Sequence, residues 1–171
     1  MAKPLAVAIS GSPRSPSRSK TLAELALTLL ADRGYDTRLI DLASLAAEAL
    51  LARTQAPEID DAITTVGAAR IAIAATPTYR ALYTGLLKCF FDLMPQGHLA
   101  GKLCIGLQTG IAREHALSTE YGLRPLFASL GGVPAVVLYA RDDEFAEGVP
   151  SEELRAGLGN ALAVVVGVAG S

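Results

Sequence analysis

The chain has 171 residues, of which 51% are hydrophobic and 19% are charged, and its formal net charge is −2. This length suits one hydrophobic core, so we predict a single domain over residues 1–171. The nearly balanced charge argues against a protein that binds nucleic acid or an anionic membrane, because either partner would call for clustered Lys and Arg. The apolar tail at residues 161–169 is far shorter than the ~20 residues of a membrane-spanning helix.

Few residues suit metal binding or nucleophilic catalysis. Cys89 and Cys104 lie in apolar runs, which favours buried and unreactive thiols. His98 and His115 show no paired spacing with cysteine, so we predict no metal site. No Gly-x-Ser-x-Gly motif supports a serine hydrolase. Because no secretory signal is evident either, the composition indicates a reduced, cytoplasmic protein.

Apolar segments that resemble strands alternate with segments of helical spacing. The predicted strands are Leu5–Ile9, Thr37–Asp41, Arg70–Ala75, Leu103–Gln108 and Ala135–Ala140. The predicted helices are Leu22–Leu30, Leu42–Leu51, Pro57–Ala68, Leu82–Met94, Glu114–Leu130 and a last helix from the N-cap Ser151 to about Val166. This alternation predicts an α/β three-layer sandwich around a parallel sheet, with ligands beyond the carboxyl ends of its strands.

The segment Gly11–Ser19, between the first strand and the first helix, is predicted to hold a phosphate. Its candidate phosphate ligands are Ser12, Arg14, Ser17, Arg18 and Ser19. Free N–H groups and the positive end of the helix dipole would face the same anion. The segment has neither the glycines of a Walker loop nor those of a dinucleotide fingerprint, so a mononucleotide phosphate is the better match. The residues alone leave open an ordinary polar turn.

Two further polar segments follow predicted strands. They span Thr76–Thr84 and Thr109–Arg113. Because the carboxyl ends of parallel strands meet at one edge of a sheet, we expect both segments to lie beside Gly11–Ser19. The sequence therefore predicts one site built from three loops.

Three ordered motifs lie in and after these loops. The first is Gly-Ser-Pro-Arg at residues 11–14 with Ser17 and Ser19, the second is Pro77-x-Tyr79 followed by Gly85, Leu87, Lys88 and Asp92, and the third is Thr109-Gly110-Ile111. By these motifs the chain resembles the NADPH-dependent FMN reductases of the flavodoxin-like superfamily. It is most similar to the flavin reductases of two-component alkanesulfonate monooxygenase systems, whose first motif reads Gly-Ser-Pro-Arg-x-Pro-Ser-Arg-Ser.

This resemblance implies a fold, two cofactors and a set of ligands. The fold would be flavodoxin-like, with a five-stranded parallel sheet in the order 2-1-3-4-5 and helices on both faces. FMN would be the flavin, and NADPH or NADH the hydride donor. The five phosphate candidates above would bind the FMN phosphate. The isoalloxazine ring would lie against Pro77, Thr78, Tyr79, Arg80, Thr109, Gly110 and Ile111.

No residue is predicted to act as a general acid or base, because the flavin and the nicotinamide carry out hydride transfer themselves. Tyr79 and Arg80 are expected only to line the site. A half-buried aromatic beside a turn is the alternative interpretation of Tyr79. Lys88 has the spacing of an i, i+4 ion pair with Asp92, which favours a structural role.

The resemblance also implies assembly and a partner. In the sulfonate-linked relatives, a tyrosine that corresponds to Tyr121 is an inserted residue and produces a π-bulge at a tetramer interface. An ordinary helix tyrosine is the alternative. The apolar segment Leu86–Met94 is also expected in a subunit interface of a dimer or tetramer. A flavin-dependent monooxygenase would then receive the reduced flavin.

Two other functions stay open at this point. A neighbouring enzyme class retains FMN and reduces quinones, azo dyes or metal oxyanions. A flavodoxin-like electron carrier is the third reading, but such carriers are strongly acidic and use a Thr-rich phosphate loop. The two arginines in Gly11–Ser19 and the nearly balanced charge favour the reductase.

Overall fold

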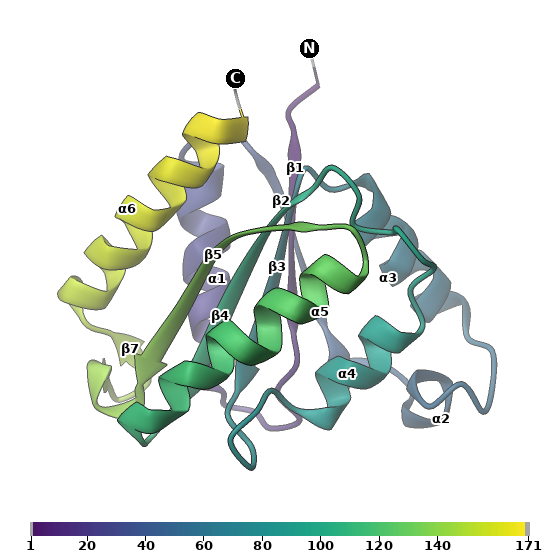
Figure 1. Cartoon of the computed structure of the whole chain (residues 1–171), viewed down its shortest axis with the longest axis horizontal. Coiled ribbons are helices and arrows are strands. Elements are labelled where there is room, and N and C mark those ends of the chain that lie inside the picture. Colours follow the sequence, from purple (N-terminus) through teal and green to yellow (C-terminus); the bar gives the residue numbers. More distant parts are fainter. Residues whose placement is uncertain (1, 170–171) are drawn as a thin grey trace.

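The computed structural model describes residues 2–169. Its main sheet has five parallel strands in the order β2-β1-β3-β4-β5 (Figure 1). The strands are β1 (Leu5–Ser10), β2 (Asp36–Asp41), β3 (Ile71–Pro77), β4 (Leu103–Gly110) and β5 (Val133–Arg141). The predicted fold class and strand order are confirmed. A short antiparallel pair that the sequence analysis missed, β6 (Phe145–Ala146) and β7 (Val149–Pro150), follows β5.

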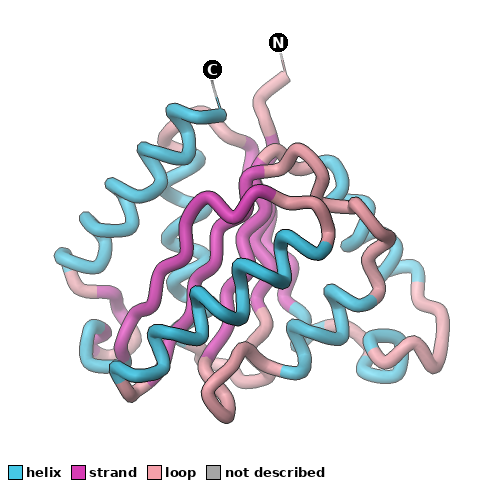
Figure 2. The backbone as a smooth tube through the Cα atoms, in the orientation of Figure 1, coloured by secondary structure: helices cyan, strands magenta, loops and turns pink. Residues whose placement is uncertain are grey.

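Helices cover both faces of the sheet (Figure 2). Helices α1 (Arg18–Ala31) and α6 (Glu152–Ala169) lie on one face, and α3 (Pro57–Ala68), α4 (Gly85–Asp92) and α5 (Arg124–Ser129) lie on the other. The central strands are buried on both sides, which explains their continuous apolar runs. In β1, Ala6 and Ala8 pack toward α1, whereas Val7 and Ile9 pack toward α3 and α4. Within residues 2–169, no helix has the length and apolar character to span a membrane.

The predicted helix Leu42–Leu51 is wrong. The structure has a 3₁₀ turn, η1 (Leu42–Ser44), and a separate four-residue helix, α2 (Ala47–Leu50). The carboxylate of Asp41 accepts a hydrogen bond from the N–H of Ala43 (3.2 Å), and the Ser44 hydroxyl donates to the Asp41 carbonyl (2.7 Å). These local bonds close the first turn early, because short polar side chains compete with helical backbone bonding.

The helix predicted from Leu82 begins three residues later, at Gly85. Thr84 is its N-cap, and the Thr84 hydroxyl accepts from the N–H of Leu87 (3.1 Å). Its apolar side chains Leu87, Phe90 and Phe91, with Met94 beyond its end, are buried within the chain. Leu86, Cys89 and Leu93 are only partly buried, so a subunit interface at Leu86–Met94 stays a prediction.

The predicted helix Glu114–Leu130 is present as one continuous helical run, but its winding changes along its length. It passes from the 3₁₀ turn η2 (Arg113–Ala116) through the π-helical segment η3 (Thr119–Leu123) into α5. Pro125 explains the π-helical winding, because it has no N–H for the carbonyl of Tyr121, four residues earlier, and its ring would clash with that carbonyl in a regular α-helix. The wider π-helical turn leaves room for the proline ring and does not require the missing hydrogen bond. Tyr121 lies inside this π-helical segment, with 79% of its surface exposed.

Candidate functional site

The loops that follow β1, β3 and β4 meet at the carboxyl edge of the sheet, at the bottom of Figure 1. They enclose a pocket of about 330 Å³ together with the segment that follows β5. The pocket is lined by Ser12, Arg14, Pro16, Ser17, Arg18, Pro77, Thr78, Tyr79, Thr109, Gly110, Ile111, His115 and Asp142. The structure thus brings together all of the predicted ligands except Ser19 and Arg80.

The N-terminus of α1 forms one end of the pocket. Ser17 is the N-cap and accepts from the N–H of Lys20 (3.3 Å), and the first turn of α1 has no acidic residue. The buried Ser12 hydroxyl accepts from the N–H of Arg14 (3.2 Å), which folds the loop back on itself. Ser19 is buried behind the lining, with its Oγ 3.0 Å from the Oγ of Ser17. Helix N–H groups, hydroxyls and two guanidinium groups suit an anion such as phosphate.

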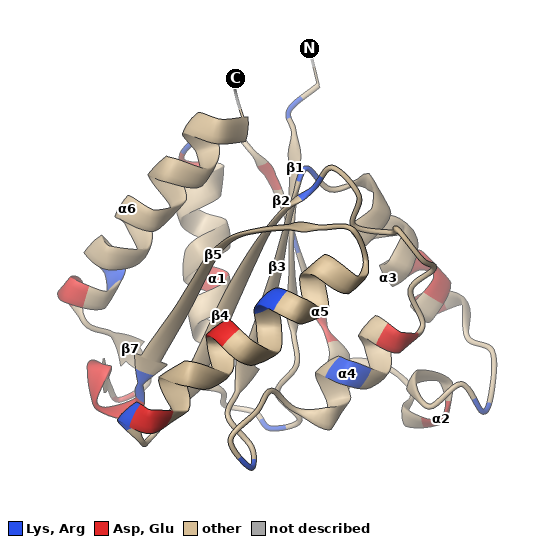
Figure 3. Cartoon of the chain, in the orientation of Figure 1, with Lys and Arg blue, Asp and Glu red and all other residues tan. Residues whose placement is uncertain are grey.

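Arg18 has a partner that the sequence analysis missed. Its Nη1 lies 3.3 Å from Oδ2 of Asp142, at the start of the 3₁₀ turn η4 (Asp142–Glu144) after β5. Acidic residues follow β5 at the same edge of the sheet that carries basic residues in the β1–α1 and β3–α4 loops (Figure 3). No local signal in the sequence pairs two residues so far apart along the chain.

A hydrogen bond from Thr84 connects the β3–α4 loop to the β1–α1 loop. Its hydroxyl donates to the carbonyl of Gly11 (2.6 Å), and its N–H donates to the hydroxyl of Thr76 (3.1 Å). Gly11 also packs closely on this side, since a Cβ there would lie 2.7 Å from Cβ of Leu87. Two loops of the site are therefore held at a fixed separation by buried contacts.

The β3–α4 loop forms a tight turn at its tip. Tyr79 and Leu82 exchange backbone hydrogen bonds of 2.9 and 3.2 Å. Arg80 and Ala81 between them have positive φ angles of 52° and 63°, as in the type I′ turn of a hairpin. This turn carries Arg80 outward, away from the pocket lining, whereas Tyr79 stays in the lining.

The opposite wall of the pocket comes from the end of β4. The N–H and the hydroxyl of Thr78 both donate to the carbonyl of Thr109, at 2.7 and 2.9 Å. A Cβ at Gly110 would lie 2.5 Å from the hydroxyl oxygen of Tyr139, so only glycine fits there. That Tyr139 hydroxyl donates to the carbonyl of Ala112 (2.8 Å), and burial raises its pKa. Ile111 projects into solvent with 82% of its surface exposed.

Three buried polar atoms near the carboxyl edge of the sheet have no hydrogen-bond partner among the described residues. The amide nitrogen of the buried Gln108 donates to the hydroxyls of Thr78 (2.9 Å) and Ser118. Its amide oxygen has no partner among the described residues, and neither do Nδ1 of His115 and the hydroxyl of Ser10. Buried polar atoms are normally hydrogen-bonded, and of these three residues His115 lines the pocket, so its Nδ1 suits a polar ligand. Gln108 was missed because it ends the predicted strand Leu103–Gln108, and Ser10 because it falls between the predicted strand Leu5–Ile9 and the predicted phosphate segment Gly11–Ser19.

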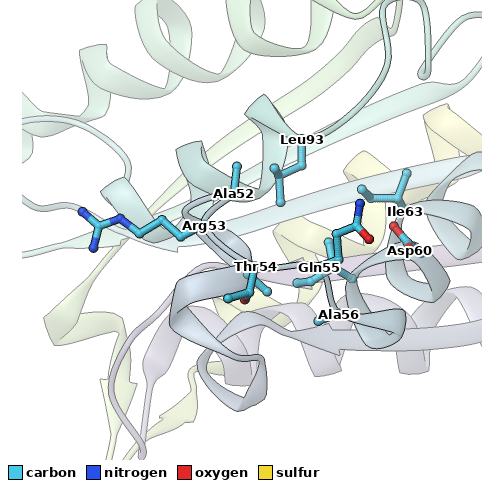
Figure 4. Close-up of a pocket in the computed structure, with 10 residues that line it drawn as sticks. Ala52, Arg53, Thr54, Gln55, Ala56, Asp60, Ile63 and Leu93 are labelled. Carbon is cyan, nitrogen blue, oxygen red and sulfur yellow. The ribbon is translucent and has the colours of Figure 1, made fainter.

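A second pocket, of about 400 Å³, lies between α2, the start of α3 and the end of α4. In Figure 4 the side chain of Arg53 extends away from the other labelled side chains. Arg53 pairs with Glu48 at 3.5 Å. None of the predicted site residues lines this pocket. The pocket at the carboxyl edge is therefore the candidate active site.

Comparisons with known proteins show the family of this chain. The family model for NADPH-dependent FMN reductase matches residues 4–146. An FMN reductase (NADPH) from Pseudomonas putida is 34% identical, over 88% of this chain and 78% of that protein. An NADH-dependent FMN reductase, SfnF, from Pseudomonas fluorescens is 35% identical, over 91% of this chain and 87% of its own length.

A solved structure agrees with the sequence comparisons. The apo form of the NADH:FMN oxidoreductase EMOB superposes with a TM-score of 0.84 and 37% identity. The alignment covers 94% of this chain and 87% of EMOB. Because the family match spans most of the chain and includes all three loops of the candidate site, the chain belongs to the NADPH-dependent FMN reductase family.

Proposed function

We propose that this chain is an NAD(P)H:FMN oxidoreductase whose pocket binds FMN with the phosphate at the N-terminus of α1. The observation that carries this proposal is the pocket itself. It joins a helix N-terminus, two arginines and serine hydroxyls to a wall of backbone and small side chains at the ends of β3 and β4. The chemistry that FMN supplies when bound is the acceptance of a hydride from NADPH or NADH.

The residues of the pocket divide into two groups. Ser12, Arg14, Ser17 and Arg18 would bind the phosphate through hydroxyl and guanidinium donors. The segments 77–79 and 109–111 would flank the flavin ring, and Gly110 lets backbone approach it. Neither group needs to move a proton at the hydride-transfer step, so the work of these residues is to bind and orient the two rings.

The reduced flavin would leave this chain for a flavin-dependent monooxygenase. Two features support release over retention. The pocket wall is open to solvent at Ile111, and Tyr79 is partly exposed. Relatives that are themselves named FMN reductases also support a free flavin as substrate.

A cytoplasmic location stays a proposal, supported by two free cysteines.

A homodimer or homotetramer is the assembly we propose. Leu82, Leu117 and Tyr121 are apolar, exposed and carried by the β3–α4 loop and the segment around η3. These two segments pack together, since a Cβ at Gly122 would lie 2.7 Å from Cδ1 of Leu82. A contiguous apolar patch of this kind suits a second copy of the chain.

Steady-state kinetics tests the function. Oxidation of NADPH and of NADH is followed at 340 nm with FMN, FAD or a quinone as acceptor. We expect saturable turnover with free FMN and a nearly colourless purified protein. A yellow protein with one FMN per chain, active on quinones and inactive with free FMN, would instead favour an enzyme that retains its flavin.

A further inference from the structure

Asp142 places a negative charge in a pocket that otherwise suits an anion. It is the single carboxylate among the described residues that line this pocket. Its Oδ2 lies 3.3 Å from Nη1 of Arg18, the first residue of α1. The pair therefore joins the start of the first helix to the segment after the last strand of the sheet.

The neighbouring acidic side chains are engaged elsewhere. Asp143 forms an ion pair with the guanidinium group of Arg141. A Glu144 carboxylate oxygen accepts from the N–H of Arg141 (2.6 Å). Neither residue lines the flavin pocket, whereas both line a separate charged pocket beside it. Asp142 thus differs from Asp143 and Glu144 because it pairs with Arg18 and lines the flavin pocket.

The ion pair is accessible and exchangeable. The side chain of Arg18 is 47% exposed and that of Asp142 is 32% exposed. An ion pair at such exposure is weak, because water and salt screen both charges. A phosphate dianion at the N-terminus of α1 would compete effectively with a single carboxylate for the same guanidinium group.

We propose that Asp142 weakens FMN binding by competing with the flavin phosphate for Arg18. This inference rests on the proposed phosphate site at α1. When the phosphate arrives, Arg18 exchanges its carboxylate partner for the phosphate, and Asp142 is left close to a dianion. When the flavin dissociates, Asp142 and Arg18 form their ion pair again. The carboxylate therefore lowers FMN affinity and speeds FMN release, as a reductase that hands over its flavin requires.

The test compares Asp142→Asn with the wild type by flavin fluorescence titration, without any nicotinamide. Asparagine keeps the size and removes the charge. We expect the variant to bind FMN about twofold to fivefold more tightly, the range set by an exposed charge pair. Riboflavin, which lacks the phosphate, should bind both proteins equally. The gain in FMN affinity should shrink at 0.5 M salt, because salt screens the repulsion.

Asp143→Asn is the matched control, since it removes one charge from the adjacent position outside the flavin pocket. It should leave FMN affinity unchanged. Unchanged or weaker FMN binding in Asp142→Asn, or equal tightening of FMN and riboflavin, would overturn the proposal. A wild-type protein that binds no FMN would refute the proposed function itself, whereas normal flavin turnover with no effect in Asp142→Asn would overturn this inference alone.

Discussion

The guanidinium carbon of Arg14 lies 5.8 Å from the ring centroid of Tyr79, so the arginine stands over the face of the aromatic ring. Arg14 belongs to the β1–α1 loop and Tyr79 to the β3–α4 loop. A cation–π contact at this distance is favourable and orients the guanidinium group. Under the proposed function, one side chain would bind the FMN phosphate while it also contacts a residue expected to lie against the flavin ring.

Replacing Arg14 should weaken FMN binding without unfolding the protein. We expect Arg14→Ala to lose about 1–3 kcal/mol of FMN binding energy, the scale of a hydrogen bond to a charged group. The melting temperature without flavin should change little, because this loop residue adds little to the core. Fluorescence titration and thermal denaturation measure both quantities. Arg155→Ala, an exposed arginine on α6, is the control and should bind FMN normally.

Adding one methyl group at Gly110 should damage the pocket wall. A Cβ there would lie 2.5 Å from the hydroxyl oxygen of Tyr139 and 2.9 Å from Oγ1 of Thr78. We expect Gly110→Ala to lose about 1–3 kcal/mol of stability from overpacking and to bind FMN more weakly. Urea denaturation and flavin titration test this.

Gly157→Ala on α6 provides the contrast. A Cβ at Gly157 meets nothing within 4 Å, so this variant should gain about 0.5–1 kcal/mol from helix propensity and keep its FMN affinity. Equal stability and affinity in Gly110→Ala and the wild type would contradict the close fit at the end of β4.

Removing the exposed aromatic of the π-helical segment should weaken assembly. We expect light scattering of the wild type to give the mass of a dimer or tetramer. Tyr121→Ala should shift the distribution of oligomers toward smaller species. It should leave monomer stability nearly unchanged, because the side chain is mostly exposed and contributes little to the core. Val164→Ala, at an exposed position on α6, should leave the mass unchanged. A wild type that stays monomeric at micromolar concentration would exclude this interface.

Cys104 should make stability fall at alkaline pH. Burial raises the pKa of its thiol from 9.0 to about 12, so the folded state keeps the proton that the unfolded chain releases. The stabilising effect is therefore complete below pH 9 and is lost between pH 9 and pH 12, at about 1.4 kcal/mol per pH unit for this group. Urea denaturation across this range should show a shallower loss for Cys104→Ala. Identical slopes would show that the thiol does not titrate as described.

The sheet and the three loops were predictable because their signals are local. The buried strands are continuous apolar runs, and polar turns follow them where parallel strands end. The composition of residues 42–51 suggests a helix, but hydrogen bonds of the Asp41 side chain and the Ser44 hydroxyl form a 3₁₀ turn at its start instead. Helical spacing alone predicts a regular helix at residues 114–130; the resemblance pointed to the π-helical turn at Tyr121, and Pro125 is its physical signal.

The residues of the site that escaped prediction depend on distant pairing. Asp142 reaches Arg18 only once β5 has been placed at the edge of the sheet. Gln108 has the pattern of an ordinary strand residue, Ser10 lies just after a predicted strand, and their unpartnered polar atoms become evident only in the folded chain. The resemblance implies that Arg80 lines the pocket together with Tyr79, but only Tyr79 is in the lining, because the two residues occupy different positions of a tight turn. Whether each lining residue binds FMN stays a prediction for the experiments above.

The start of β1 and the end of α6 lie at the edge of the sheet opposite the three loops of the candidate site (Figure 1). The Arg70 guanidinium group, just before β3, donates to the carbonyl of Ala169 (3.0 Å) and holds the end of α6 at that edge. A fusion partner or an immobilising support attached there would leave the three loops facing solution. If the chain releases reduced flavin as proposed, tethering it at this edge to an enzyme that consumes the flavin would let the linker length set the local concentration of reduced flavin.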